Sequence, residues 1–133
     1  MKYLKSYENL NKIIGYHVAP RKLDNEINDN GIKNIERKGY RHGKEITIPI
    51  KNYFWLDFKY ADWFKNLHED EQLNDEPQAM TIWEVDLTGY NLIDDPESID
   101  MSEWSSQFEK GENGQAVYTI HNIPSERILN KYR

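Results

Sequence analysis

The chain has 133 residues and a formal net charge of −6, so we expect one domain over residues 1–133 and no broad electrostatic surface for nucleic acid. It contains no cysteine, which excludes disulfides, thiolate metal sites and a cysteine nucleophile. No stretch approaches the ~20 apolar residues of a membrane span, and the first residues lack an apolar run of signal-peptide length, so we expect a soluble, cytoplasmic protein with no membrane partner.

The first predicted elements are a strand at residues 12–18 and a helix at residues 20–30. The strand is rich in β-branched and aromatic residues. In the helix, Leu23 and Ile27 lie four positions apart and share a face, and Gly31 supplies a stop signal.

Residues 36–44 are charged and contain two glycines, so we predict a loop. Five basic residues gather in and beside it: Lys33, Arg37, Lys38, Arg41 and Lys44. A solvated loop is the favoured interpretation of this cluster, and contact with phosphate is the alternative. Residues 45–50 alternate apolar and polar side chains and predict an edge strand, because Pro49 cannot donate to a ladder.

A short strand at residues 52–56 precedes a helix at about 58–67, with Asp57 as its cap. Four residues share the apolar face of this helix: Tyr60, Ala61, Phe64 and Leu67. Residues 68–78 predict an acidic surface loop, and residues 79–87 predict a strand with one face only partly buried.

The second half of the chain adds more strands. Residues 94–114 are polar and give no ordered prediction, residues 115–121 predict a strand, and a strand-like tail follows residue 128. The order β-α-β-β-α-β-β-β predicts an α+β fold rather than a repeating βαβ fold. No glycine-rich phosphate loop of either familiar spacing is present, so a Rossmann site is not expected.

Three segments together resemble the ADP-ribosyltransferase-like superfamily. The first is Gly15-Tyr16-His17-Val18-Ala19-Pro20 followed by a helix ending in Asn-Gly-Ile, and the second is Asn52-Tyr53-Phe54 followed by a helix with Ala61 and Trp63. The third and loosest is Ile82-Trp83-Glu84-Val85-Asp86-Leu87, then Gln115-Ala116-Val117-Tyr118 and the closing phrase Ile123-Pro124-Ser125-Glu126-Arg127-Ile128. The superfamily includes poly(ADP-ribose) polymerases, diphtheria-type toxins and RNA 2′-phosphotransferases. The resemblance implies a small fold of curved antiparallel or mixed sheets with two main helices, in which the strands at 12–18 and 52–56 are adjacent.

The resemblance also implies an NAD site of the His–Tyr–Glu type. The histidine that hydrogen-bonds a ribose falls on His17, the tyrosine that packs on nicotinamide falls on Tyr53, and the second stacking aromatic falls on Trp63. Tyr16, the aromatic partner of His17 in its motif, is the fourth expected cofactor-binding residue. NAD is then a substrate, and no metal is implied.

The glutamate column of that pattern is occupied by Gln115, which is a departure from it. An amide can hydrogen-bond a ribose hydroxyl but offers no negative charge to an oxocarbenium ion. Glu112, in a loop flanked by Gly111 and Gly114, is the alternative catalytic residue, with Glu84 next.

Each of these residues also has a purely structural interpretation. His17 can be satisfied by backbone, Tyr53 can belong to a core strand, and Trp63 can cover the sheet. Glu84 and Asp86 lie about 7 Å apart on one strand face, which is compatible with acid/base chemistry, although an exposed strand face is the favoured interpretation. The four histidines show no metal-ligand spacing.

The resemblance predicts a protein that binds NAD and transfers ADP-ribose to a macromolecular acceptor, or hydrolyses NAD. A protein acceptor is favoured over nucleic acid. The alternative is a catalytically inactive protein of the same fold that binds a nucleotide or blocks a partner. The bias toward Lys, Asn, Ile, Asp and Glu suggests an AT-rich phage or bacterial genome, where a toxin or counter-defence factor fits.

Overall fold

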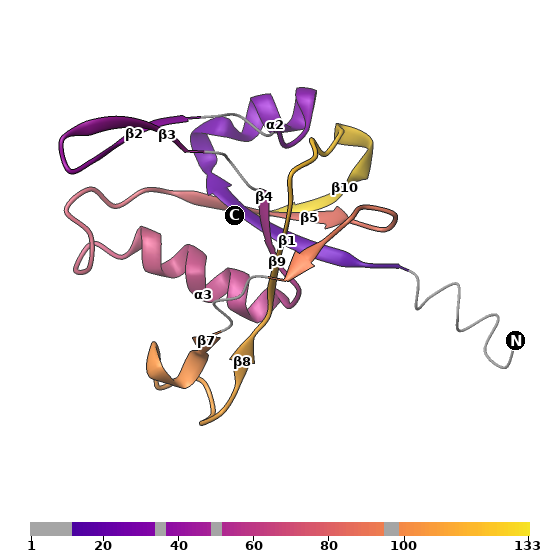
Figure 1. Ribbon diagram of the computed structural model, residues 1–133. Helices are drawn as coiled ribbons and strands as arrows, with labels where there is room; N and C mark the ends of the chain where they lie inside the picture. The colour runs from indigo at the N-terminus through magenta and orange to yellow at the C-terminus, as the bar shows by residue number, and fades with distance from the viewer. Residues whose placement is uncertain (1–11, 34–36, 49–51, 95–98) are drawn as a thin grey trace, which may run out of the picture.

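The computed structural model describes residues 12–33, 37–48, 52–94 and 99–133. At its centre is a six-stranded sheet with the order β10-β5-β1-β4-β9-β6 (Figure 1), in which every pairing is antiparallel. The strands of this sheet are β1 Ile14–Pro20, β4 Asn52–Trp55, β5 Met80–Asp86, β6 Ile93–Asp94, β9 Ala116–Thr119 and β10 Ile128–Tyr132. The α+β class and the adjacency of the first and fourth strands are therefore confirmed.

Among the described residues, two α-helices accompany the sheet, α2 (Asp24–Asn30) and α3 (Phe58–Glu69). The Asp57 side chain caps α3 by accepting a hydrogen bond from the Lys59 backbone N–H. The single helix expected at residues 20–30 begins instead as a 3₁₀ turn, η1 (Arg21–Leu23). Because the tighter turn rotates Leu23 away from the face of Ile27, Leu23 is exposed while Ile27 is buried.

The expectation of a loop at residues 36–44 is wrong. The chain forms a hairpin of β2 (Arg37–Arg41) and β3 (Lys44–Ile48), joined by two residues and separate from the main sheet (Figure 1). His42 has φ 53 and Gly43 has φ 76, and two positive φ values suit the tight turn that a right-twisted hairpin needs. The expected strand at 45–50 is thus the return strand of this hairpin, while Pro49 lies outside the described residues.

The segment 94–114, which gave no sequence prediction, contains three short elements. They are β7 (Ile99–Asp100), the 3₁₀ turn η2 (Met101–Glu103) and β8 (Asn113–Gly114), which pairs with β7. A last 3₁₀ turn, η3 (Ser125–Arg127), leads into β10. No helix in the described part of the chain is long and apolar enough to cross a membrane.

Two apolar clusters lie on opposite sides of the sheet. The larger, here the sheet core, contains the fully buried Phe54, Trp83, Val85 and Leu87 together with Ile27 of α2. The smaller, here the α3 cluster, consists of Tyr60, Met101 and Phe108, with Trp55 and Trp63 packed against it. Phe54 and Trp55 are consecutive in β4, so their side chains leave opposite faces of the sheet and separate the two clusters.

The strand β5 is more buried than its sequence pattern suggests. As predicted, Thr81, Trp83 and Val85 share one face, and all three are fully buried. Met80 and Ile82 on the other face are buried too, because α3 packs on β5. Partial burial on that face is restricted to its last residues, Glu84 and Asp86.

Candidate functional site

His17 lies on β1 directly after the residue that pairs in register with β4. Along β1, seven residues pair in register with β5, whereas the register between β1 and β4 holds a single described pair, Tyr16 with Trp55. Just past this pair, the Nδ1 atom of His17 lies 2.8 Å from the carbonyl oxygen of Tyr53. The imidazole thus satisfies a carbonyl of the neighbouring strand.

The contact with Tyr53 fixes the state of the His17 ring. A carbonyl oxygen only accepts hydrogen bonds, so Nδ1 carries the proton and donates it, and in the neutral ring Nε2 is an acceptor. The His17 ring packs against Phe54, with 5.3 Å between ring centroids. Burial lowers the pKa of His17 below its ordinary 6.5, an effect that the contact with the Tyr53 carbonyl partly offsets. The neutral ring can therefore accept a hydrogen bond from a ligand hydroxyl through Nε2.

Tyr53 brings an exposed aromatic ring to the same place. Its backbone touches His17, but strand alternation puts its ring on the face opposite Phe54 and the imidazole. The ring is 47% exposed and lies 5.6 Å from the ring of Tyr118, its register partner on β9. The imidazole of His17 and the phenol of Tyr53 therefore lie on opposite faces of the sheet, although their strands are adjacent.

Gln115 lies one strand further along the sheet, immediately before β9. Its carbonyl oxygen accepts a 3.0 Å hydrogen bond from the backbone N–H of Leu56, just after β4, and its side chain is exposed. Because the sheet order runs β1-β4-β9, the three positions of the His–Tyr–Glu pattern, His17, Tyr53 and Gln115, come from neighbouring strands.

Glu112 is held by α3. Its Oε2 atom accepts a 2.7 Å hydrogen bond from the Tyr60 hydroxyl and forms a 2.7 Å ion pair with Lys59. Its Oε1 atom accepts from the Glu109 backbone N–H at 3.2 Å. Hydrogen bonds from Lys59 and Tyr60 hold the pKa of Glu112 below its usual value. In this arrangement the carboxylate is ionised, and its charge is already balanced by Lys59.

Trp63 and Tyr16 lie on the side of the sheet that α3 covers. Trp63 packs in the α3 cluster, with ring centroids 6.5 Å from Trp55 and 6.0 Å from Phe108. Tyr16 contacts Phe58 edge-on at 5.6 Å, and burial, followed by the charge of Glu84, raises the pKa of Tyr16. Both rings are thus packing groups here and do not meet the imidazole of His17.

Glu84 and Asp86 have separate structural partners. Glu84 accepts a 3.1 Å hydrogen bond from the Tyr132 hydroxyl. Asp86 accepts from the Thr88 backbone N–H at 3.0 Å and lies 3.9 Å from Arg127, and hydrogen bonding with Thr88 holds its pKa below the usual value. The two carboxylates fasten β5 to its neighbours.

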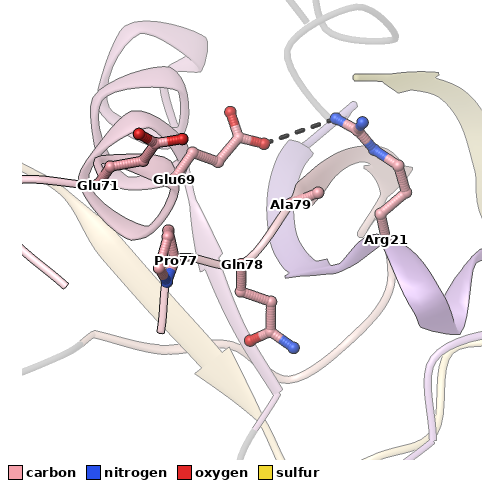
Figure 2. A pocket seen from close by; sticks show the side chains of 6 residues that line it. All are labelled: Arg21, Glu69, Glu71, Pro77, Gln78 and Ala79. Carbon is pink, nitrogen blue, oxygen red and sulfur yellow. Dashed lines mark ion pairs between the residues drawn. The ribbon is translucent and has the colours of Figure 1, made fainter. Parts of the chain in front are cut away.

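A surface pocket of about 380 Å³ lies beyond the end of β1 (Figure 2). It is lined by Arg21, Glu69, Glu71, Pro77, Gln78 and Ala79, none of which the sequence singled out. The Arg21 guanidinium reaches toward Glu69 at 3.5 Å and donates to the Met80 carbonyl at 3.1 Å. The segment expected as a solvated acidic loop thus contributes Glu69 to an internal network, which no local sequence signal reveals.

Glu69 is at the centre of that network. Besides Arg21, it pairs with Lys65 at 2.7 Å and accepts a 2.8 Å hydrogen bond from the Met80 backbone N–H. Burial opposes its charge, but the hydrogen bonds from Lys65 and Met80 outweigh burial and hold the pKa of Glu69 below its usual value. Arg21 and Lys65 thus share the carboxylate of Glu69, which links α3 to the end of β1 and the start of β5.

Within the described residues, no group of three or more His, Asp or Glu side chains is arranged to hold a metal ion. The chain matches no protein-family model, no curated protein and no solved structure.

Proposed function

We propose that this protein binds NAD beside the contact between His17 of β1 and Tyr53 of β4 and acts as an ADP-ribosyltransferase-like domain on a macromolecular acceptor. The observation that carries the proposal is the contact between His17 and Tyr53 on neighbouring strands, with Gln115 at the start of the next strand. Three residues that the sequence pattern groups from distant segments thereby lie on one part of the sheet.

The proposal gives each of these residues a chemical role. The Nε2 atom of His17 accepts a hydrogen bond from a ribose hydroxyl, and the exposed ring of Tyr53 offers a stacking surface for nicotinamide. The glycosidic C–N bond breaks, nicotinamide leaves as a neutral molecule with the bonding electron pair, and the acceptor bonds to the ribose carbon and loses a proton. Glu112 is the available carboxylate for the positive charge on the ribose, provided that it leaves Lys59.

The second candidate function is nucleotide binding without turnover. Two observations favour it: Gln115 brings no charge, and the carboxylate of Glu112 is balanced by Lys59 and bound by Tyr60. An oxocarbenium ion is stabilised by a preorganised negative charge, and in this conformation neither residue supplies one.

Thermal unfolding with and without ligand tests the proposal. NAD at ~100 times its dissociation constant should add about 2.7 kcal/mol of stability, which raises Tm by several degrees for a chain of this length. ADP-ribose, which lacks nicotinamide, should give a smaller shift. No shift at millimolar NAD or ADP-ribose contradicts both candidate functions, whereas a shift without release of nicotinamide selects the second.

A further inference from the structure

Three aromatic side chains meet on the face of the sheet that α3 covers, at the N-terminal end of that helix. The ring of Phe58, the first residue of α3, contacts Tyr16 edge-on at 5.6 Å and Tyr132 edge-on at 5.0 Å between ring centroids. Phe58 is 37% exposed and the two tyrosines are half-buried, whereas Ile82 on the same face is buried. The three rings therefore form an aromatic surface that solvent reaches, here the Phe58 surface.

The carboxylate of Glu84 lies between the two tyrosines of this surface. Glu84 is on β5, which runs between β1 with Tyr16 and β10 with Tyr132. It is directly opposite Tyr16 in register, and its Oε1 atom accepts a 3.1 Å hydrogen bond from the Tyr132 hydroxyl. A carboxylate has about four acceptor positions, so Glu84 can accept further hydrogen bonds from a ligand.

The charge of Glu84 is not balanced by a cation of this protein. Glu69, Asp86 and Glu112 each form an ion pair with a lysine or an arginine, but Glu84 forms none within the described part of the chain. The partner that holds Glu84 is a neutral hydroxyl. A half-buried carboxylate of this kind gains from a cation that arrives from outside.

The two tyrosines are affected by the same negative charge. Burial raises the pKa of Tyr16, and the charges of Glu84 and Asp57 raise it further. The hydrogen bond to Glu84 raises the pKa of Tyr132. Both hydroxyls therefore stay neutral, and the carboxylates give the Phe58 surface a negative potential that attracts cations.

A guanidinium group matches these features better than an ammonium group. It is planar and can lie on an aromatic ring, and its five N–H donors suit the remaining acceptor positions of a carboxylate. The ammonium of lysine is a more strongly hydrated point charge, so it gains less from contact with the rings. Because Phe58 is exposed to solvent, a side chain that projects from another protein can reach this surface.

We propose that the Phe58 surface docks an arginine side chain of a partner protein. The guanidinium donates hydrogen bonds to Glu84 and lies against the rings of Phe58, Tyr16 and Tyr132. The contact recognises a partner without making or breaking a bond. It goes beyond NAD binding and does not depend on it.

An NMR titration of the isotope-labelled protein with the peptide acetyl-Gly-Arg-Gly-amide, in the absence of NAD, tests the proposal. The largest chemical-shift changes should occur at Tyr16, Phe58, Glu84 and Tyr132. The same peptide with citrulline in place of arginine keeps the shape but lacks the charge, and it should bind at least about 10-fold more weakly. The peptide with lysine in place of arginine should also bind more weakly.

Two variants separate the carboxylate from the ring. Glu84→Gln should weaken binding of the arginine peptide by about 10-fold or more, because it removes the charge but keeps an acceptor for Tyr132. Phe58→Leu should weaken it by about 2–5-fold. The matched control is Glu26→Gln, which removes the same charge from an exposed position on α2, on the other side of the sheet, and should leave the affinity unchanged.

Circular dichroism and melting establish that each variant is folded, and the comparison of arginine with citrulline needs no variant at all. Equal binding of the citrulline peptide, tighter binding of the lysine peptide, or an equal loss of affinity in Glu26→Gln would overturn the proposal. Chemical-shift changes that lie away from the Phe58 surface, or no changes at tens of millimolar peptide, would overturn it as well.

Discussion

The Nδ1 atom of His17 lies 2.8 Å from the carbonyl oxygen of Tyr53, just past the pair of Tyr16 with Trp55. The contact gives the Tyr53 carbonyl a hydrogen-bond donor from a side chain of the neighbouring strand. His17 is thus both a structural residue and the best candidate to meet a ligand.

The first prediction concerns the stability contributed by His17 as a function of pH. Because its pKa is lower in the folded protein than the ordinary 6.5, the unfolded chain binds more protons, and stability rises with pH across this range. On acidification, the wild type should begin to lose stability near pH 6.5. His17→Gln should lack this loss, as measured by urea unfolding between pH 5 and 8. If the free energy of unfolding changes with pH in the same way in both proteins, burial does not lower the pKa of His17.

The second prediction concerns Gly31, which ends α2 with φ 78 and whose added Cβ would lie 2.0 Å from the Ile123 carbonyl oxygen. Gly89 has a similar φ of 89 but open space around it. Gly89→Ala should lower the free energy of unfolding by about 1–3 kcal/mol, the cost of holding a non-glycine residue at positive φ. Gly31→Ala should cost at least about 1 kcal/mol more, because the chain must also move. Equal costs in chemical unfolding would mean that the contact between Gly31 and Ile123 is loose.

The third prediction separates Tyr53 from Trp63. Tyr53→Leu should weaken NAD binding by about 1–3 kcal/mol, the usual worth of a stacked ring, and lower stability by no more than about 1 kcal/mol. Trp63→Leu should show the reverse, with a stability loss of about 1–3 kcal/mol and unchanged affinity, because Trp63 packs in the α3 cluster. Calorimetric titration with NAD and thermal unfolding measure the two effects. A loss of affinity in Trp63→Leu would instead place Trp63 in the nucleotide site.

The fourth prediction concerns the missing carboxylate. Gln115→Glu restores the charge of the His–Tyr–Glu pattern at an exposed position, so nicotinamide release should rise by about 10²–10³ while NAD affinity stays the same. If Glu112 supplies the charge in the wild type, Glu112→Gln should lower release by the same order.

Lys59→Met is the control for that pair, since it removes the partner of Glu112 but keeps the carboxylate. It should raise release if the ion pair restrains Glu112. If Glu112→Gln keeps full activity, Glu112 has no catalytic role. If neither the wild type nor Gln115→Glu releases nicotinamide, the protein binds NAD without turning it over.

Much of the fold was predictable because it depends on local signals. Asp57 before an apolar helix face and the alternation along β5 each predict an element, and both elements exist. The hairpin of β2 and β3 was not predicted, because His-Gly is a weaker turn signal than Asn-Gly. Both His42 and Gly43 nevertheless have positive φ. Charged residues concealed the period of two in β2, whereas the alternation of residues 45–50 predicted the return strand.

The candidate site was predictable only in part. The resemblance predicts that His17, Tyr53 and Gln115 form one site, but the faces on which their side chains lie depend on register. That register follows from the pairing of Tyr16 with Trp55, which is a tertiary contact. The partners of Glu112 could not be predicted either, because Lys59 and Tyr60 are more than 50 positions away in the chain.

The most direct test of the central claim is the change in backbone amide chemical shifts of the ¹⁵N-labelled protein on titration with NAD. The account predicts the largest changes where β1, β4 and β9 meet, at His17, Tyr53, Leu56 and Gln115, and their loss in His17→Gln. Changes confined to the pocket around Arg21 and Glu69, or no change at millimolar NAD, would contradict it.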